Sequence, residues 1–219
     1  EQYAGIKAAC EEILAGKHHE AFPVDMIQGG AGTSTNMNAN EVIANIALLH
    51  MGHKPGEYEY CSPHDHVNRS QSTNDAYPTA IHMGLYASHL ALLPHLEALI
   101  AEFRKRGDDF ASIVKMGRTQ LEDAVPMTLG QTFYGFASIL EDELTHLSEA
   151  AADFLTVNLG ATAIGTGICS EPGYAEKAVE ALGRITGWNV KLAKDWVGAT
   201  SDTSCMVGYM SALKRVAIK

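Results

Sequence analysis

Apolar residues recur at steps of three and four along two unusually long segments of the chain. From Asp75 to about Arg106 the series is Ile81, Leu85, Ser88, Leu92, Leu96, Leu99 and Phe103, with one small polar residue, Ser88, among the apolar ones. From about Thr128 to Val157 it is Phe133, Phe136, Leu140, Leu144, Leu147, Ala151 and Phe154. This spacing gives a helix one apolar face, so it predicts two helices of roughly 30 residues each. Helices well beyond the globular mean of about 12 residues usually belong to a long bundle.

The remaining patterns predict shorter elements in a mainly α fold. We expect helices over residues 38–51, 174–186 and 203–219, and a further helical pattern begins near Glu1. Only EYEYC (57–61) and SIVKM (112–116) carry the β-branched and aromatic residues typical of strands. Because both ends of the chain fall within helical patterns, we expect these residues to be part of a longer polypeptide.

Charge narrows the classes of partner. The chain has 219 residues, 46% of them hydrophobic, and a formal net charge of −10. It contains no block of basic residues, so nucleic acid and anionic membrane surfaces are poor candidates. No apolar run approaches the roughly 20 residues that a membrane helix needs. The sequence therefore favours a small-molecule ligand.

The cysteines indicate a reducing compartment. Cys10, Cys61, Cys169 and Cys205 are widely scattered and form neither a CxxC pair nor a metal-type spacing. This distribution is typical of reduced thiols in a cytoplasmic protein rather than of a disulfide framework. His64 and His66 form an H-x-H pair, but no third metal ligand lies at a diagnostic distance. A serine-hydrolase elbow, G-x-S-x-G, is absent.

Four segments rich in Gly, Ser, Thr and Asn interrupt the helical patterns. They are GGAGTSTN (29–36), QSTND (71–75), GRTQ (117–120) and GATAIGTG (160–167). Loops of this kind before a helix present unpaired backbone N–H groups and the positive end of the helix dipole, which suits an anion. The first segment lacks the GK[ST] of a P-loop and does not fit G-x-G-x-x-G, so a nucleotide site is not indicated.

Purely structural roles remain open for most of these polar residues. Ser72 or Thr73, followed by Asp75, also fits an N-cap for the long helix. Thr119 and Gln120 also fit a plain turn. Arg69 and Arg118 are expected to pair with acidic neighbours rather than to contact a ligand.

Taken together, the motifs resemble those of the aspartase/fumarase superfamily over essentially the whole chain. The resemblance rests on GTSTNMNANEV, HVNRSQSTNDAYPT, GRTQLEDAVPMTLGQ and LGATAIGTG, in this order and spacing. It is closest to the aspartase branch, since fumarases usually have GTQTNMN, SSND and GRTH. Some aspartases keep that histidine, so Gln120 argues against a fumarase more than it establishes an aspartase.

The resemblance implies a homotetramer whose subunits contribute long helices to one shared bundle, with each active site built from three subunits. Residues 1–68 would then be the end of an N-terminal domain that carries the first substrate-binding loop. Residues 69–219 would be the central helical-bundle domain, incomplete at its C-terminus.

The implied reaction is reversible, cofactor-free elimination of ammonia from L-aspartate to give fumarate, with no metal site. By resemblance, Thr33, Ser72 and Thr73 hold the β-carboxylate and its aci intermediate. Asn74 and Thr119, together with Gln120, orient the departing amino group. Neutral donors of this kind stabilise developing charge without over-binding the ground state.

The family's general base is a serine in a GSSxMPxKxN loop, which this sequence does not contain. Chain order places that loop beyond Lys219, so we expect these 219 residues to bind substrate but not to turn it over alone. Two alternatives remain open. One is a fumarate hydratase, and the other is a truncated, non-catalytic homologue that acts as an oligomeric structural protein.

Overall fold

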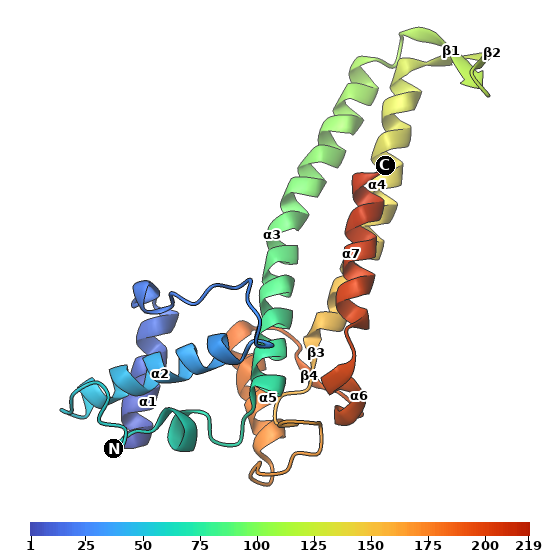
Figure 1. Cartoon of the computed structure of the whole chain (residues 1–219). Coiled ribbons are helices and arrows are strands. Elements are labelled where there is room, and N and C mark those ends of the chain that lie inside the picture. The colour runs from blue at the N-terminus through green and yellow to red at the C-terminus, as the bar shows by residue number, and fades with distance from the viewer. The chain divides into compact units, whose positions relative to one another are not determined.

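The computed structural model describes all 219 residues and contains two compact units, each formed from two segments of the chain (Figure 1). The first unit comprises Glu1–Ile81 and Thr156–Ser201, and the second comprises His82–Leu155 and Asp202–Lys219. The two units separate within the long helix, after Ile81. The domain boundary expected between residues 68 and 69 stays a prediction.

The fold is mainly α, as the sequence predicts. The helices are α1 (Gln2–Leu14), α2 (Thr33–His50), α3 (Thr73–Asp109), α4 (Leu129–Ala152), α5 (Tyr174–Thr186), α6 (Trp196–Ser201) and α7 (Ser204–Ala217). Short helical turns are η1 (His19–Ala21), η2 (Pro63–Val67) and η3 (Asp153–Leu155). Strands β1 (Val114–Thr119) and β2 (Glu122–Thr128) pair antiparallel, whereas β3 (Thr156–Val157) and β4 (Lys191–Leu192) pair parallel.

Both long helices are confirmed, with changed ends. The first extends over 37 residues as α3. The second ends at Ala152 rather than Val157, because the chain turns through η3 and then pairs as β3. The helix predicted from residue 38 begins five residues earlier, at Thr33, so the hydroxyl-rich stretch forms its first turn.

The strand predictions are partly wrong. Residues 57–61 form turns rather than a strand. Their aromatic side chains are used locally: the Tyr60 ring stacks on His53 at 3.8 Å between centroids, and the Tyr58 hydroxyl accepts a hydrogen bond from Asn45. The second prediction is displaced, since β1 begins at Val114. Its partner β2 was not predicted because it is mostly exposed and lacks an alternating apolar pattern.

In the first unit, α1 packs closely against α2. The core comprises Ala9, Val42, Ala44, Ile46, Ala47, Leu48 and Cys61. A Cβ atom on Gly5 would lie 2.9 Å from the Ala47 carbonyl oxygen, so the absence of a side chain at Gly5 permits this contact. α1 therefore supports the C-terminal half of α2, from Val42 to Leu48.

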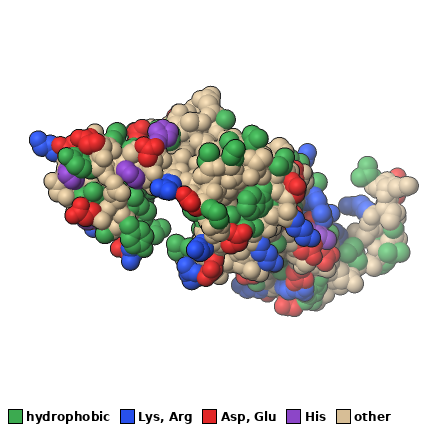
Figure 2. Space-filling view, turned by 90° about the horizontal axis from the view of Figure 1, so that it is seen from below, with side chains coloured by type: hydrophobic (Ala, Val, Ile, Leu, Met, Phe, Trp, Pro, Cys, Tyr) green, Lys and Arg blue, Asp and Glu red, His purple; other side chains and the backbone are tan.

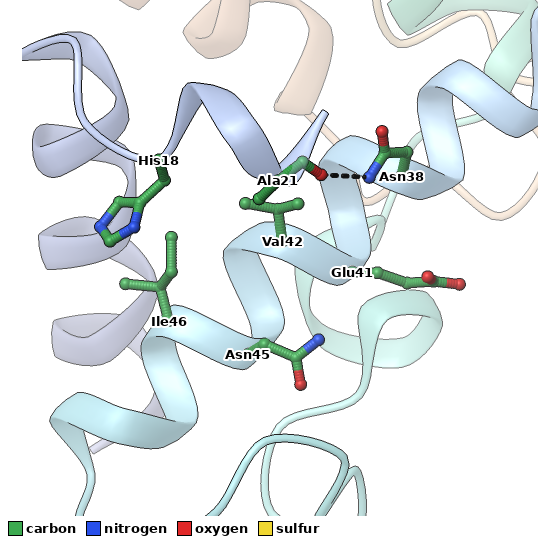
Figure 3. Close-up of a pocket in the computed structure, with 7 residues that line it drawn as sticks. All are labelled: His18, Ala21, Asn38, Glu41, Val42, Asn45 and Ile46. Carbon is green, nitrogen blue, oxygen red and sulfur yellow. Dashed lines mark hydrogen bonds between the residues drawn. The ribbon is translucent and has the colours of Figure 1, made fainter. Parts of the chain in front are cut away.

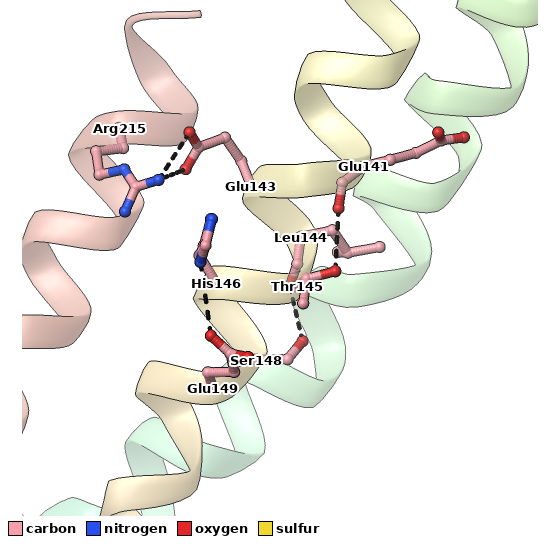
Figure 4. A network of polar contacts seen from close by, with 8 residues as sticks. All are labelled: Glu141, Glu143, Leu144, Thr145, His146, Ser148, Glu149 and Arg215. Carbon is pink, nitrogen blue, oxygen red and sulfur yellow. Dashed lines mark hydrogen bonds and ion pairs between the residues drawn. The ribbon is translucent and has the colours of Figure 1, made fainter.

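In the second unit, α7 packs on α4 through an apolar cluster and an ion pair between a buried glutamate and a half-exposed arginine. The cluster comprises Leu147, Ala151, Phe154, Tyr209 and Ala212, with apolar residues of α3 against it. Glu143 of α4 is only 5% exposed, and its carboxylate lies 2.9 Å from the Arg215 guanidinium of α7 (Figure 4). A buried carboxylate requires such a partner, so this pair fixes how α7 lies along α4.

The surface carries charges of both signs without a basic patch on the face seen in Figure 2, where Lys and Arg side chains lie among Asp and Glu side chains. None of the helices combines the length and the apolar composition required to cross a membrane. The expectation that nucleic acid is a poor partner rests on this mixed distribution and on the net charge of −10.

The contact between the end of α3 and the start of α4 offers a test of close packing in the second unit. A Cβ atom on Gly130 would lie 2.4 Å from the Gly107 carbonyl oxygen and 2.8 Å from Ala111 Cα. We expect Gly130→Ala to lower the free energy of unfolding by about 2 kcal/mol, measured by thermal unfolding. The control is Gly135→Ala on the same helix, where no atom lies within 4 Å, and it should stabilise slightly. Equal effects of the two changes would contradict this packing.

Candidate functional site

A cavity of about 360 Å³ lies in the first unit where three of the four hydroxyl-rich motifs meet. Thr33, Ser72 and Thr73, all predicted site residues, line it. The other lining residues are Asn36, Met37, His64, Asn68, Gln71, Thr162, Ala163, Ile168 and Cys169. No Asp, Glu, Lys or Arg is among them, so the polar lining consists of hydroxyls, amides, one imidazole and one thiol.

The cavity lies at the N-termini of two helices. Thr33 is the first residue of α2, and Thr73 is the first residue of α3. The N-terminal turns of helices present unpaired N–H groups and partial positive charge, which favour an anion. Two such ends at one cavity supply partial positive charge without any cationic side chain.

Gly32 explains how the two helix ends approach each other. Its φ of 80° lies in the left-handed region, and a Cβ atom there would lie 2.2 Å from the Tyr77 ring of α3. Only glycine meets both conditions. The glycine-rich stretch before α2 is therefore needed for close approach of the chain to α3.

Asparagine side chains join α2 to the segment that precedes α3. Asn36 Nδ2 donates to Thr73 Oγ1 at 3.1 Å and to Asn68 Oδ1 at 3.3 Å. Asn40 Nδ2 also donates to Asn68 Oδ1, at 3.2 Å. Because the Thr73 hydroxyl accepts a hydrogen bond from Asn36, its own proton is left to donate to a ligand.

Asp75 connects this region to the motif at 160–167. Its carboxylate is fully buried and accepts hydrogen bonds from the backbone N–H groups of Ser72 (2.9 Å), Thr162 (2.8 Å) and Gly160 (3.2 Å). Burial raises the pKa of Asp75 above its ordinary value of 3.8, although these N–H groups oppose the shift. Burial, with a smaller effect of the Asp75 charge, raises the pKa of Tyr174 to about 12.

The N-cap alternative for Ser72 is confirmed alongside its position in the cavity. Ser72 Oγ accepts a hydrogen bond from the Asn74 N–H at 3.2 Å at the start of α3. Asn74 does not line the cavity, and its side-chain Nδ2 donates to the Ala163 carbonyl at 2.7 Å. The predicted role of Asn74 in orienting an amino group therefore stays a prediction.

Thr119 and Gln120 are not among the residues that line this cavity. They lie at the β1–β2 turn in the second unit, where Gln120 and Leu121 have φ values of 50° and 68°. The turn alternative is confirmed, and their proposed contact with substrate stays a prediction. The ion-pair alternative is also confirmed for both arginines: Arg69 pairs with Glu171 and Arg118 with Asp123, each at 2.9 Å.

Several cavity residues were not singled out from the sequence. Asn36, Gln71 and Thr162 lie inside the quoted motifs, but only the fold shows which of their side chains reach the cavity. His64 lines the cavity, whereas His66 accepts a hydrogen bond from the Ser62 N–H at 2.8 Å through Nδ1. The two rings of the H-x-H pair therefore have different surroundings.

A second hollow, of about 310 Å³, lies beside α2 (Figure 3). Its lining comprises His18, Ala21, Asn38, Glu41, Val42, Asn45 and Ile46. Asn38 donates to the Ala21 carbonyl at 2.9 Å, and Glu41 adds a negative charge. This hollow lacks hydroxyl donors and carries a carboxylate, so the first cavity suits an anionic ligand better.

Comparison with known proteins identifies the family to which the sequence is similar. The family model described as "Lyase" matches residues 1–219. An aspartate ammonia-lyase from Pseudomonas aeruginosa is 56% identical over 220 residues, covering 100% of this chain and 46% of that protein. One from Escherichia coli is 51% identical over 215 residues, covering 98% of this chain and 45% of that protein. The chain therefore spans about half the length of these relatives.

Solved structures give the same result. A fumarate lyase:delta crystallin from Brucella melitensis, bound to cobalt, superposes with a TM-score of 0.96 at 50% identity, covering 99% of this chain and 47% of that chain. A class II fumarase from Schistosoma mansoni superposes with a TM-score of 0.90 at 30% identity, covering 99% of this chain and 49% of that chain. The predicted helical fold type is confirmed.

Asp75→Asn tests the hydrogen bonds through which Asp75 joins the motif at 71–75 to the motif at 160–167. The amide replaces one acceptor oxygen by a donor, so at least one of the three N–H groups loses its partner, and we expect a loss of about 2 kcal/mol at neutral pH. Because the folded pKa of Asp75 is raised, protonation of its carboxyl group adds stability to the wild type, and this added stability is fully present below pH 3.8 and is lost as pH rises through the raised value. The stability difference between the wild type and Asp75→Asn should therefore decline over that window towards its value at neutral pH.

Thermal unfolding of both proteins across this pH range measures the effect. Asp25→Asn is the matched control, because Asp25 is exposed and accepts one backbone hydrogen bond, from Ile27. It should change stability by less than about 1 kcal/mol. An Asp75→Asn protein as stable as this control would refute the structural role given to Asp75.

Proposed function

The chain belongs to the lyase family, and from this premise we propose that the full-length protein eliminates ammonia from L-aspartate, reversibly, to give fumarate. The observation that carries the proposal is a cavity lined by neutral donors at the N-termini of two helices. Support also comes from relatives named aspartate ammonia-lyase at 51–56% identity across the chain. The motifs STND and GRTQ also differ from the usual fumarase forms, SSND and GRTH, which argues against a fumarase.

The chemistry explains why neutral donors are suitable. Elimination requires removal of a proton from the carbon next to the β-carboxylate. The electron pair left behind spreads into that carboxylate, which becomes an aci form with an additional negative charge. Preorganised hydroxyl and backbone N–H donors stabilise that charge as it develops, and each is typically worth about 3 kcal/mol in the transition state.

We assign the β-carboxylate to Thr33, Ser72 and Thr73. All three line the cavity, and the Thr73 hydroxyl already accepts a hydrogen bond from Asn36, so its own proton is left to donate to a ligand. We assign the departing amino group to Asn74, Thr119 and Gln120. The general base is a serine that we expect beyond Lys219, and no cofactor is required by this scheme.

We further propose a homotetramer in the cytoplasm. In the second unit, apolar side chains remain exposed along three helices: Leu90, Leu99, Tyr134, Phe136, Ile139, Val207 and Met210. Exposed apolar stripes of this extent are typical of association surfaces. Assembly would also let a neighbouring subunit contribute Thr119 and Gln120. All four cysteines are free, which supports a reducing compartment.

Fumarate hydratase is the second candidate, because the same hydrogen-bond donors could bind a carboxylate of malate and because a class II fumarase shares this fold. The full-length gene product should be incubated separately with L-aspartate and L-malate, and fumarate, ammonia and malate quantified. We expect fumarate and ammonia in equal amounts from aspartate and no reaction with malate. Turnover of malate alone would replace the proposal by the hydratase, and turnover of neither would favour a non-catalytic homologue.

Thr73→Ala in the full-length enzyme tests the proposed carboxylate grip. Loss of one donor to the aci intermediate should lower kcat about 100-fold, because the donor acts chiefly in the transition state. Thr73→Ser keeps the hydroxyl and should retain most of the activity. The mass of the assembled oligomer, measured by native mass spectrometry, should be the same in both variants as in the wild type. Wild-type turnover by Thr73→Ala would remove Thr73 from the site.

A further inference from the structure

We propose that Thr162 is an additional substrate-binding residue, whose hydroxyl donates a hydrogen bond to a carboxylate of the substrate. The inference rests on the proposed function and extends it, because it adds the loop at 160–167 to the residues that recognise the dicarboxylate.

The first observation is an unpartnered hydroxyl beside the cavity. Thr162 is 5% exposed and lines the cavity together with Thr33, Ser72 and Thr73. Its Oγ1 is buried and has no hydrogen-bond partner within the chain. A buried donor without a partner lowers stability, so folded proteins rarely keep one unless a ligand or water supplies the acceptor.

The second observation is the backbone conformation of the same residue. Thr162 has a φ of 60°, in the left-handed region that β-branched residues strongly disfavour. The buried Asp75 carboxylate holds this conformation by accepting the Thr162 N–H at 2.8 Å. Glycine or asparagine would fit this backbone more easily, so the threonine side chain has a use that offsets the strain.

The third observation is that Asp75 positions Thr162 and Ser72 together. One carboxylate oxygen accepts the Ser72 N–H at 2.9 Å, and the other accepts the N–H groups of Thr162 and Gly160. Both hydroxyl residues line the cavity. A single buried group therefore fixes the spacing of two donors, which is the preorganisation that carboxylate binding requires.

Thr79 provides an internal comparison. Its Oγ1 is also buried and unpartnered, and the residue is likewise 5% exposed. Thr79 lies within α3, however, and does not line the cavity. A buried hydroxyl without a hydrogen-bond partner therefore does not by itself indicate a ligand. Comparing Thr162 with Thr79 shows whether removal of such a hydroxyl affects substrate binding only when the residue lines the cavity.

The test uses Thr162→Val in the full-length protein, because valine keeps the β-branched shape and removes only the hydroxyl. We expect KM for L-aspartate to rise about 10-fold or more, as for loss of a hydrogen bond to a charged group. The Kd for succinate, an unreactive dicarboxylate measured by calorimetry, should rise by a similar factor. The Tm without ligand should stay equal or rise, since an unsatisfied buried hydroxyl is removed.

Two further variants serve as controls. Thr162→Ser should restore KM and Kd close to wild type, because it returns the donor. Thr79→Val should keep or raise the Tm in the same way without changing KM or Kd.

The outcomes separate this inference from the proposed function. If the wild type neither turns over aspartate nor binds succinate, the proposed function fails, and the inference fails with it. If the wild type does both and Thr162→Val leaves KM and Kd unchanged, only the role of Thr162 is overturned. A Thr162→Val protein that is misfolded or has a lowered Tm would also overturn it, because the hydroxyl would then serve the fold.

Discussion

The candidate site depends on one interaction, the acceptance of three backbone N–H groups by the buried Asp75 carboxylate. A carboxylate that has lost its water requires donors in return, and here they come from the start of α3 and from the loop at 160–167. Removing either set leaves a buried charge or buried N–H groups unsatisfied. The loop at 160–167 and the start of α3 therefore stabilise each other through Asp75.

Around that interaction, the cavity combines two helix N-termini with a lining of neutral polar side chains. Gly32 lets the chain before α2 approach Tyr77 closely, and Asn36 connects α2 to Thr73. Both contacts keep two helix N-termini at one cavity. With a net charge of −10, the molecule as a whole repels an anion, so the proposed binding of a dicarboxylate would depend on these short-range donors. In the proposed reaction, neutral donors would also avoid holding the substrate more tightly than the intermediate.

Features that depend on the periodicity of apolar residues, or on motifs that are continuous in the chain, could be predicted from the sequence. The long helices follow from their apolar repeats, and Thr33, Ser72 and Thr73 from motifs that are continuous in the chain. The β1–β2 hairpin was missed because exposed strands carry little alternation. Asn68 and Thr162 were missed because their roles depend on neighbours 32 and 87 residues away, which no local pattern encodes. EYEYC was wrong because its aromatic rings pack on a nearby turn.

The long separation between Asp75 and its donors also bears on how the protein folds. Gly160 and Thr162 follow Asp75 by 85 and 87 residues. Closing so large a loop is entropically unfavourable, and contacts of this range tend to form late. While the ribosome is still making α3 and α4, the Asp75 carboxylate remains hydrated and the pocket has no far wall. The cavity is therefore complete only after the nascent chain has delivered its 160–167 loop.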